Sequence, residues 1–248
     1  MNMKRLIFLL CTVLLTACAA VFQQVAVTAA HYRVQENAVN YVYWQPLSGQ
    51  YALSPVVGAD PETFEQLRAH YGRDQNAVYR GNQVIEKADP DSFRFLNEFY
   101  AVDKSHAYFD GLMLMGSDSD TFAYLGDSWA KDKSDYYYTA IKLDVCDRAS
   151  FEIIKPFRAR DSNCYFYMGE KVPIRDIDSL VVLSASYAKD KRYVYWGRFI
   201  VEGADPESFV VKNASSISIA KDKYFCYAAA RKLDCAALNK GGQLFCGC

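Results

Sequence analysis

The chain has 248 residues, of which 51% are hydrophobic and 23% charged, and its formal net charge is −1. This is an ordinary globular composition, long enough to bury a sizeable core in one or two domains. The near-neutral charge and the lack of a basic run exclude nucleic-acid binding of the usual electrostatic kind. With 19 Tyr and 15 Phe the composition favours strands, and we expect a mainly β fold.

The first residues have the pattern of an export signal. Lys4 and Arg5 form a positive start, and residues 6–15 form an apolar run that is too short to cross a bilayer as a helix. We therefore expect a signal peptide over residues 1–17.

The end of this signal resembles that of a bacterial lipoprotein, in which a small residue such as Ala17 precedes the cysteine that receives the lipid. We expect lipidation of Cys18, with acyl chains such as palmitate giving stable membrane anchoring, and a tether over residues 18–38. Ala19 replaces the aspartate that retains lipoproteins in the inner membrane, which favours the outer membrane, facing the periplasm or the cell surface. The alternative is a plain secretory signal, because the same residues fit a small-x-small cleavage site.

The most regular feature of the sequence is a repeat of 29 residues. An aspartate followed three residues later by serine or threonine, and then by phenylalanine or leucine, returns at this spacing. The copies begin at Asp60, Asp89, Asp118, Asp147, Asp176, Asp205 and, in degenerate form, Asp234. Seven copies in step indicate a tandem repeat protein, in which each unit buries its apolar face against its neighbours.

A second aspartate keeps the same period and is followed five residues later by an aromatic residue. These aspartates are Asp74, Asp103, Asp132, Asp161, Asp190 and, three residues late, Asp222. The aromatic residues are Tyr79, Tyr108, Tyr137, Phe166, Tyr195 and Tyr227. An irregular first copy over residues 39–44 opens the array.

The local structure of one repeat can be predicted from residues 187–209. Residues 187–201 predict three short strands, joined by a tight turn at Asp190 and by a second turn. Glycine marks this second turn, where the backbone needs a positive φ, at Gly81, Gly111, Gly169 and Gly197. Asp205 followed by proline suits a helix N-cap and predicts a helical turn. We expect 29-residue repeats, each a short β-meander plus a helical turn, stacked into an elongated array.

The motif Tyr-Ala-Lys-Asp-Lys-Arg-Tyr-Val-Tyr at residues 187–195, followed by Gly-Ala-Asp-Pro-Glu-Ser-Phe at residues 203–209, resembles the bacterial DKNYY family. The resemblance implies a repeat domain over residues 39–238. We expect a cysteine-containing tail over residues 239–248. The resemblance also implies a secreted or lipoprotein module of unknown function, and it supplies no catalytic residues.

The recurring aspartates allow two interpretations. Several converging carboxylates could bind calcium. Each aspartate stands in its own turn or cap, however, and we assign both sets to turns and caps.

The aromatic residues form two columns. Tyr79 and its equivalents lie on one face of each sheet and their successors, such as Tyr138, on the other, because side chains alternate along a strand. One column would then be partly exposed, and exposed rings suit sugars or peptides. The candidate binding aromatics are Tyr108, Tyr137, Tyr138, Tyr167, Tyr195 and Trp196.

Six cysteines follow the signal region, which suggests disulfides in an oxidising compartment. They are Cys146, Cys164, Cys226, Cys235, Cys246 and Cys248. We predict the pairs Cys146–Cys164 and Cys226–Cys235, with the last two cysteines closing on each other or on a partner. The cysteine spacings lack a CxxC pair, so neither a zinc site nor a redox catalyst is expected.

Three functional hypotheses follow. The first is a membrane-anchored binding module of the cell envelope, with a protein or glycan partner and without a metal or cofactor. The second is a structural envelope-maintenance lipoprotein without a specific ligand. The third, an enzyme, has little support, because the recurring residues are explained by the repeat and no known catalytic motif occurs.

Overall fold

The computed structural model describes residues 30–155, 157–212, 219–233 and 246. The chain divides into two compact units, one ending at Asp120 and the other beginning at Thr121. The predicted signal peptide and Cys18 lie outside the described residues, as do Cys235, Cys248 and most of the predicted tail. No helix among the described residues is long and apolar enough to cross a membrane.

The first unit opens with a three-stranded antiparallel sheet. Its strands are β1 (His31–Gln35), β2 (Ala38–Gln45) and β3 (Gln50–Pro55), in that order. β1 lies inside residues 18–38, for which the sequence predicted a tether. That boundary was wrong, because all five residues of β1 pair with β2.

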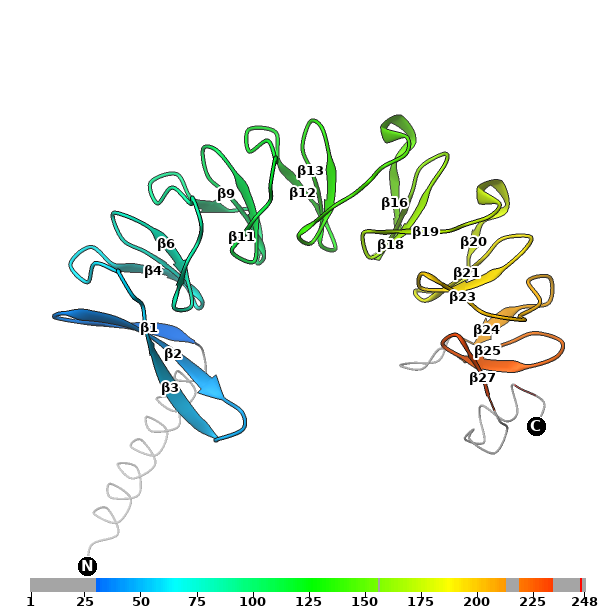
Figure 1. Ribbon diagram of the computed structural model, residues 1–248, viewed down its shortest axis with the longest axis horizontal. Coiled ribbons are helices and arrows are strands. Elements are labelled where there is room, and N and C mark those ends of the chain that lie inside the picture. The colour runs from blue at the N-terminus through cyan, green and yellow to red at the C-terminus, as the bar shows by residue number, and fades with distance from the viewer. Residues whose placement is uncertain (1–29, 156, 213–218, 234–245, 247–248) are drawn as a thin grey trace, which may run out of the picture. The chain divides into compact units, whose positions relative to one another are not determined.

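Two four-stranded antiparallel sheets follow in the first unit (Figure 1). The first contains β4 (Glu65–Arg68), β5 (Tyr71–Arg73), β6 (Val78–Arg80) and β7 (Gln83–Val84). The second contains β8 (Arg94–Phe95), β9 (Tyr100–Val102), β10 (Ala107–Phe109) and β11 (Leu112–Met113). In each, consecutive strands are neighbours, so every repeat is a meander.

The second unit contains four such sheets. The first has β12 (Ala123–Gly126), β13 (Trp129–Lys131), β14 (Tyr136–Tyr138) and β15 (Ile141–Lys142). The second has β16 (Glu152–Lys155), β17 (Arg158–Arg160), β18 (Tyr165–Tyr167) and β19 (Glu170–Val172). The third has β20 (Val181–Val182), β21 (Tyr187–Lys189), β22 (Val194–Trp196) and β23 (Phe199–Ile200). The fourth has β24 (Val210–Lys212), β25 (Ile219–Lys221), β26 (Cys226–Ala228) and β27 (Arg231–Lys232).

The mainly β fold and the repeated meander predicted from the sequence are confirmed. The three strands expected over residues 187–201 are β21, β22 and β23, and β20 adds a fourth to their edge. The turn prediction also holds, since Gly197 has a φ of 58° and Gly81 one of 59°.

The sequence predicted a helical turn in every repeat, and the structure does not support it as a general feature. Among the described copies, two form a three-residue 3-10 helix, η1 (Arg148–Ser150) and η2 (Ile177–Ser179). Others form a single hydrogen-bonded turn, as where the Thr63 N–H donates to the Asp60 carbonyl at 3.3 Å. The next strand begins almost at once, β4 at Glu65, and this leaves no room for a second helical turn.

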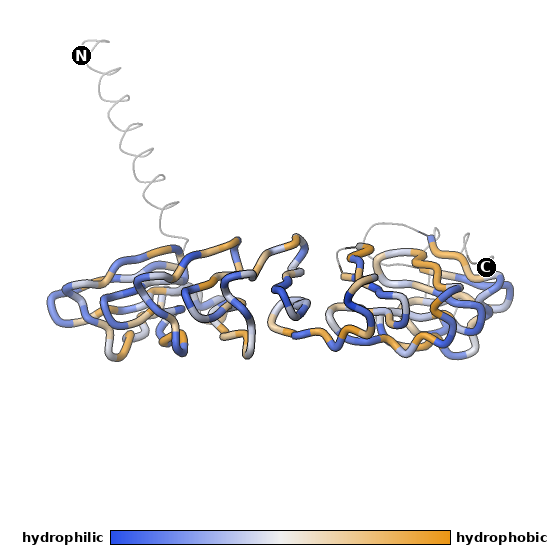
Figure 2. The backbone as a smooth tube through the Cα atoms, turned by 90° about the horizontal axis from the view of Figure 1, so that it is seen from above, coloured by the Kyte–Doolittle hydropathy of each residue, from blue (hydrophilic) through white to orange (hydrophobic). Residues whose placement is uncertain are grey.

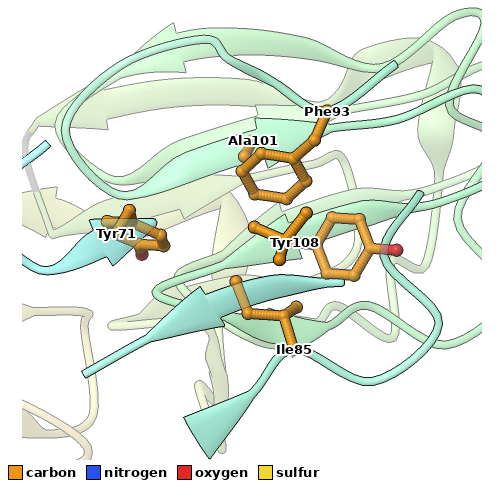
Figure 3. Packing of buried hydrophobic residues seen from close by; sticks show 6 residues of the cluster. Tyr71, Ile85, Phe93, Ala101 and Tyr108 are labelled. Atoms are coloured by element: carbon orange, nitrogen blue, oxygen red, sulfur yellow. The ribbon is translucent and has the colours of Figure 1, made fainter. Parts of the chain in front are cut away.

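The hydrophobic core lies between consecutive sheets of a unit rather than inside one sheet. In the first unit Tyr71 and Ile85 of one repeat pack with Phe93, Ala101 and Tyr108 of the next (Figure 3). The second unit repeats this arrangement, with one cluster at each junction. A single repeat cannot bury its own apolar surface, which is the physical reason for stacking.

Both faces of an inner sheet are therefore covered. Along β6, Val78 packs toward the following sheet, whereas Tyr79 packs with Tyr32 and Val39 of the preceding one. Figure 2 shows hydrophobic and hydrophilic residues alternating over short stretches of the chain. The small strands thus supply two cores at once.

Candidate functional site

The second aspartate of each repeat is buried and organises the turn that follows it. These six turn aspartates are Asp74, Asp103, Asp132, Asp161, Asp190 and Asp222. In every copy the Oδ1 oxygen accepts hydrogen bonds from the backbone N–H groups two and three residues later, at 2.6–2.8 Å. A short polar side chain can hold a tight turn in this way.

The Oδ2 oxygen of the turn aspartates binds two further donors. In five copies the tyrosine five residues later donates its hydroxyl at 2.7–2.9 Å. In five copies the backbone N–H of the first aspartate of the repeat donates at 2.7–3.2 Å. The buried charge is therefore compensated by about four hydrogen bonds rather than by a cation.

The first aspartate of each repeat, here the cap aspartate, completes the network. In four copies its carboxylate accepts the hydroxyl of the serine or threonine three residues later, at 2.5–2.8 Å. That hydroxyl oxygen accepts the backbone N–H that follows the turn aspartate, at 2.8–3.2 Å in six copies. Both aspartate columns thus serve turns, as the sequence predicted.

The network shifts the pKa of its members. Burial alone would raise the pKa of Asp190, but hydrogen bonds from the Tyr195 hydroxyl and from backbone N–H groups outweigh it, and the pKa lies below its usual value. Burial and the bond to Asp190 raise the pKa of Tyr195, so its phenol stays protonated and donates. The pKa is lowered in the same way in Asp74, Asp103 and Asp222.

Acid is therefore expected to destabilise the fold below about pH 4, the pKa range of unfolded aspartate. The folded carboxylates have the lower pKa, so the unfolded chain binds protons first and the free energy of unfolding falls as pH drops through the folded pKa. Urea unfolding between neutral pH and about pH 3, followed by circular dichroism, measures this. An unchanged midpoint at the acid end would contradict the role given to these carboxylates.

Four of the six candidate binding aromatics are buried, which corrects the sequence interpretation. Tyr108, Tyr137, Tyr138 and Tyr195 are at most 5% exposed, so their rings cannot meet a ligand. The error arises because a neighbouring sheet covers each face of an inner sheet.

Tyr167 and Trp196 are half-buried and also serve packing. A Cβ atom added to Gly197 would lie 3.0 Å from Cε1 of Tyr167, so the ring of one repeat rests on the turn of the next. Trp196 packs at the edge of the following cluster. The aromatic columns are consequently parts of the junctions between repeats.

The cysteine predictions are half right. Cys146 and Cys164 form the predicted disulfide, with their Cα atoms 5.9 Å apart. The pair Cys226–Cys235 is wrong, as is closure of Cys246 on Cys248, because Cys226 bonds to Cys246. The prediction considered cysteines within one hairpin, whereas Cys226 and Cys246 are 20 residues apart in the sequence.

One cluster has the ligand types of a metal site. Asp161 lies with Cys146 and Cys164, and their ligand atoms fall within 4.8 Å of one another. The two sulfur atoms are already bonded to each other, and both carboxylate oxygens accept backbone N–H groups. This donor set does not fit a metal ion.

Two grooves in the second unit are built from the same repeat positions. The larger, of about 480 Å³, is lined by Ser134, Asp135, Tyr136, Lys142, Leu143, Asp144, Val145 and Arg148. The smaller, of about 320 Å³, is lined by Asn163, Cys164, Tyr165, Lys171, Val172, Pro173 and Ile174. Every residue of the smaller groove stands 29 positions after a residue of the larger one.

The larger groove carries both signs of charge. Lys142 forms an ion pair with Asp135 at 2.7 Å. The Arg148 guanidinium lies 4.7 Å from the ring centre of Tyr136, which stacks on Phe151. Such a surface suits a polar, charged partner better than an apolar small molecule.

An ion pair also connects the two grooves. Lys171 of the smaller groove pairs with Asp144 of the larger at 2.6 Å. Lys142 and Lys171 keep about half and two-fifths of their side chains exposed, so a partner could exchange these surface ion pairs for its own.

Sequence reasoning missed these groove residues, although a signal was present. Lys142 and Lys171 are 29 residues apart and so keep the period of the repeat. To locate the groove one must know which positions are exposed, and the sequence does not give this.

Comparison with known proteins agrees with the repeat. The DKNYY family matches residues 35–90 and 71–198. No curated protein and no solved structure is detectably similar to the chain. The two overlapping matches together span residues 35–198, more than half of the sequence, and the chain therefore belongs to the DKNYY family.

Proposed function

We propose that this protein is a lipid-anchored interaction module of the cell envelope, whose stacked repeats bind a protein partner. The observation that carries the proposal is the pair of equivalent open grooves on consecutive repeats. Two grooves at the same position of consecutive repeats suit a chain-like partner that contacts both repeats.

The repeated residues support binding rather than catalysis. Hydrogen bonds within the fold occupy the turn aspartates, the cap aspartates and their tyrosines. His106 lies near a turn aspartate, 3.8 Å from Asp103, but the same aspartate–tyrosine pair forms in repeats without a histidine. The aspartate–tyrosine pair is therefore structural.

A protein partner fits the surface better than a glycan. Sugar rings are usually held against exposed aromatic faces, and four of the six rings considered for that role are buried. The grooves instead offer Lys142, Lys171 and Arg148 beside carboxylates. The proposed location, an outer membrane reached through a lipid on Cys18, follows from the signal pattern.

Reversing the charge of the two groove lysines is expected to lower partner recovery about tenfold or more, because truncated charge pairs at interfaces cost several kcal/mol. The experiment is a pull-down from envelope extracts with the mature chain and its Lys142→Glu, Lys171→Glu double variant. Lys131→Glu with Lys191→Glu changes the net charge equally on exposed lysines outside these grooves and serves as control.

Equal recovery by both double variants would reject the grooves as the binding surface. The mass of the N-terminal peptide from the native host tests anchoring separately, since a lipid adds to the mass at Cys18. An unmodified Cys18 would reject the anchor and leave the groove result intact.

A further inference from the structure

The hairpin of β2 and β3 in the first unit carries an exposed apolar surface. Trp44 and Tyr51 are cross-strand partners whose ring centres are 5.2 Å apart. Trp44 is 48% exposed and Tyr51 39%. Leu53 is 54% exposed, and Leu47, in the turn between the strands, is fully exposed. These four residues are the hairpin patch.

The hairpin patch lies in the middle of an uncharged stretch. Residues 37–59 contain no Asp, Glu, Lys, Arg or His, whereas at the chain's average of 23% about five charged residues would occur in that length. A surface without charges can leave water without the large cost of desolvating an ion. Some exposed large apolar residues elsewhere stand beside a charged residue, as Ile141 does beside Lys142 and Phe199 beside Arg198.

The chain places this hairpin close to the proposed anchor. β1 begins at His31, thirteen residues after Cys18, and a chain of that length reaches at most about 45 Å when fully extended. β1 then pairs directly with β2, His31 opposite Val42, so the anchor and the hairpin share one short connection.

We propose that the β2–β3 hairpin is a membrane-contact element that inserts the hairpin patch into the headgroup region of the bilayer. The proposal rests on the lipid anchor within the proposed function. Trp and Tyr favour the membrane interface, where one end of the ring is apolar and the other wet. A leucine at the tip adds apolar area that the anchored lipid alone does not supply.

The chemistry of the patch specifies the kind of membrane contact. Because the hairpin patch has no charge, it inserts into zwitterionic and anionic bilayers alike, and its insertion is insensitive to salt. Two attachments, the lipid and the hairpin, hold the first unit in one orientation on the bilayer.

In the test the chain is attached to vesicles by a tag, so the result does not depend on whether Cys18 is lipidated in the cell. Residues 18–248 with Cys18→Ser carry a hexahistidine tag in place of the signal and are bound to phosphatidylcholine vesicles that contain nickel-chelating lipid. Trp44 emission is read with and without phosphatidylcholine brominated near the headgroup. Trp44→Phe supplies the background of Trp129, which is buried, and of Trp196.

We expect Trp44 emission to move to shorter wavelength on the vesicles and to be quenched by the brominated lipid at low and high salt. Leu47→Asp should abolish both effects, because it puts a charge at the tip of the hairpin without touching the core. Leu112→Asp, on another exposed leucine of the same unit, should leave them unchanged.

Unquenched Trp44 emission on the vesicles overturns the proposal. A concentration-dependent dimer that shields Trp44 without vesicles would also overturn it and assign the patch to a second copy. Unquenched emission together with loss of an envelope protein in the Leu47→Asp pull-down would assign it to a protein. Quenching on the vesicles with an unmodified Cys18 in the native host keeps the contact and rejects only the anchor.

Discussion

Replacing Asp190 by alanine is expected to lower the free energy of unfolding of the second unit by at least about 4 kcal/mol. The carboxylate accepts the Tyr195 hydroxyl at 2.7 Å and the N–H groups of Arg192 and Tyr193 at 2.7 Å each. Two more N–H groups, of Arg175 and Asp176, reach its Oδ2 oxygen. Alanine leaves these donors unpaired in a buried site, at about 1–3 kcal/mol each.

Urea unfolding followed by circular dichroism measures the effect. Asp178→Ala removes an exposed carboxylate from the same repeat and should change stability by no more than about 0.5 kcal/mol. Asp190→Asn keeps one oxygen acceptor but turns an amide toward the donors. We expect its loss of unfolding free energy to lie between those of Asp190→Ala and Asp178→Ala. Equal stability of the Asp190→Ala and Asp178→Ala chains would contradict the network.

Replacing Arg158 by tyrosine is expected to stabilise the second unit by about 1–4 kcal/mol. Arg158 is fully buried, and its Nη2 has no hydrogen-bond partner among the described residues. Its other contacts are the Ala185 carbonyl, the Tyr165 hydroxyl and the Tyr167 ring, none of which carries a full negative charge. Burial lowers the pKa of Arg158 to about 10, which reflects the cost of holding the cation there.

Tyrosine fits this position, because the equivalent residues of other repeats are aromatic. They are Tyr71, Tyr100, Trp129 and Tyr187. The stabilisation appears as a higher urea midpoint with an unchanged slope. Arg160→Tyr, at an exposed position two residues away, is the matched control. A destabilised Arg158→Tyr chain would contradict the cost assigned to the buried cation.

The repeat period alone predicts much of this structure. It places the turn aspartates, the strand–turn–strand order and the positive φ of Gly197, because one local interaction pattern recurs in every copy. It could not predict the burial of Tyr137 and Tyr138 together. Tyr138 packs against the sheet of the next repeat, and the alternation of side chains along a strand describes one sheet alone.

The candidate site was less predictable than the fold. The grooves depend on which side chains stay exposed after stacking, and Lys142 stays half exposed on β15 at the edge of its sheet. The bond between Cys226 and Cys246 depends on the path of the tail, which no local pattern encodes. Arg158 stands where four other repeats have an aromatic residue, and these four residues do not predict that a cation is buried there.

The position of the core between repeats bears on how such a chain can change over evolution. Tyr71 and Ile85 pack with Phe93 and Tyr108 at one junction, and the junctions within the second unit are built in the same way. Duplicating or losing one 29-residue copy by recombination therefore joins a leading face to a trailing face that already match. The length of the array can vary in whole steps without new packing solutions, while the edge residues of each copy diverge independently toward their own partners.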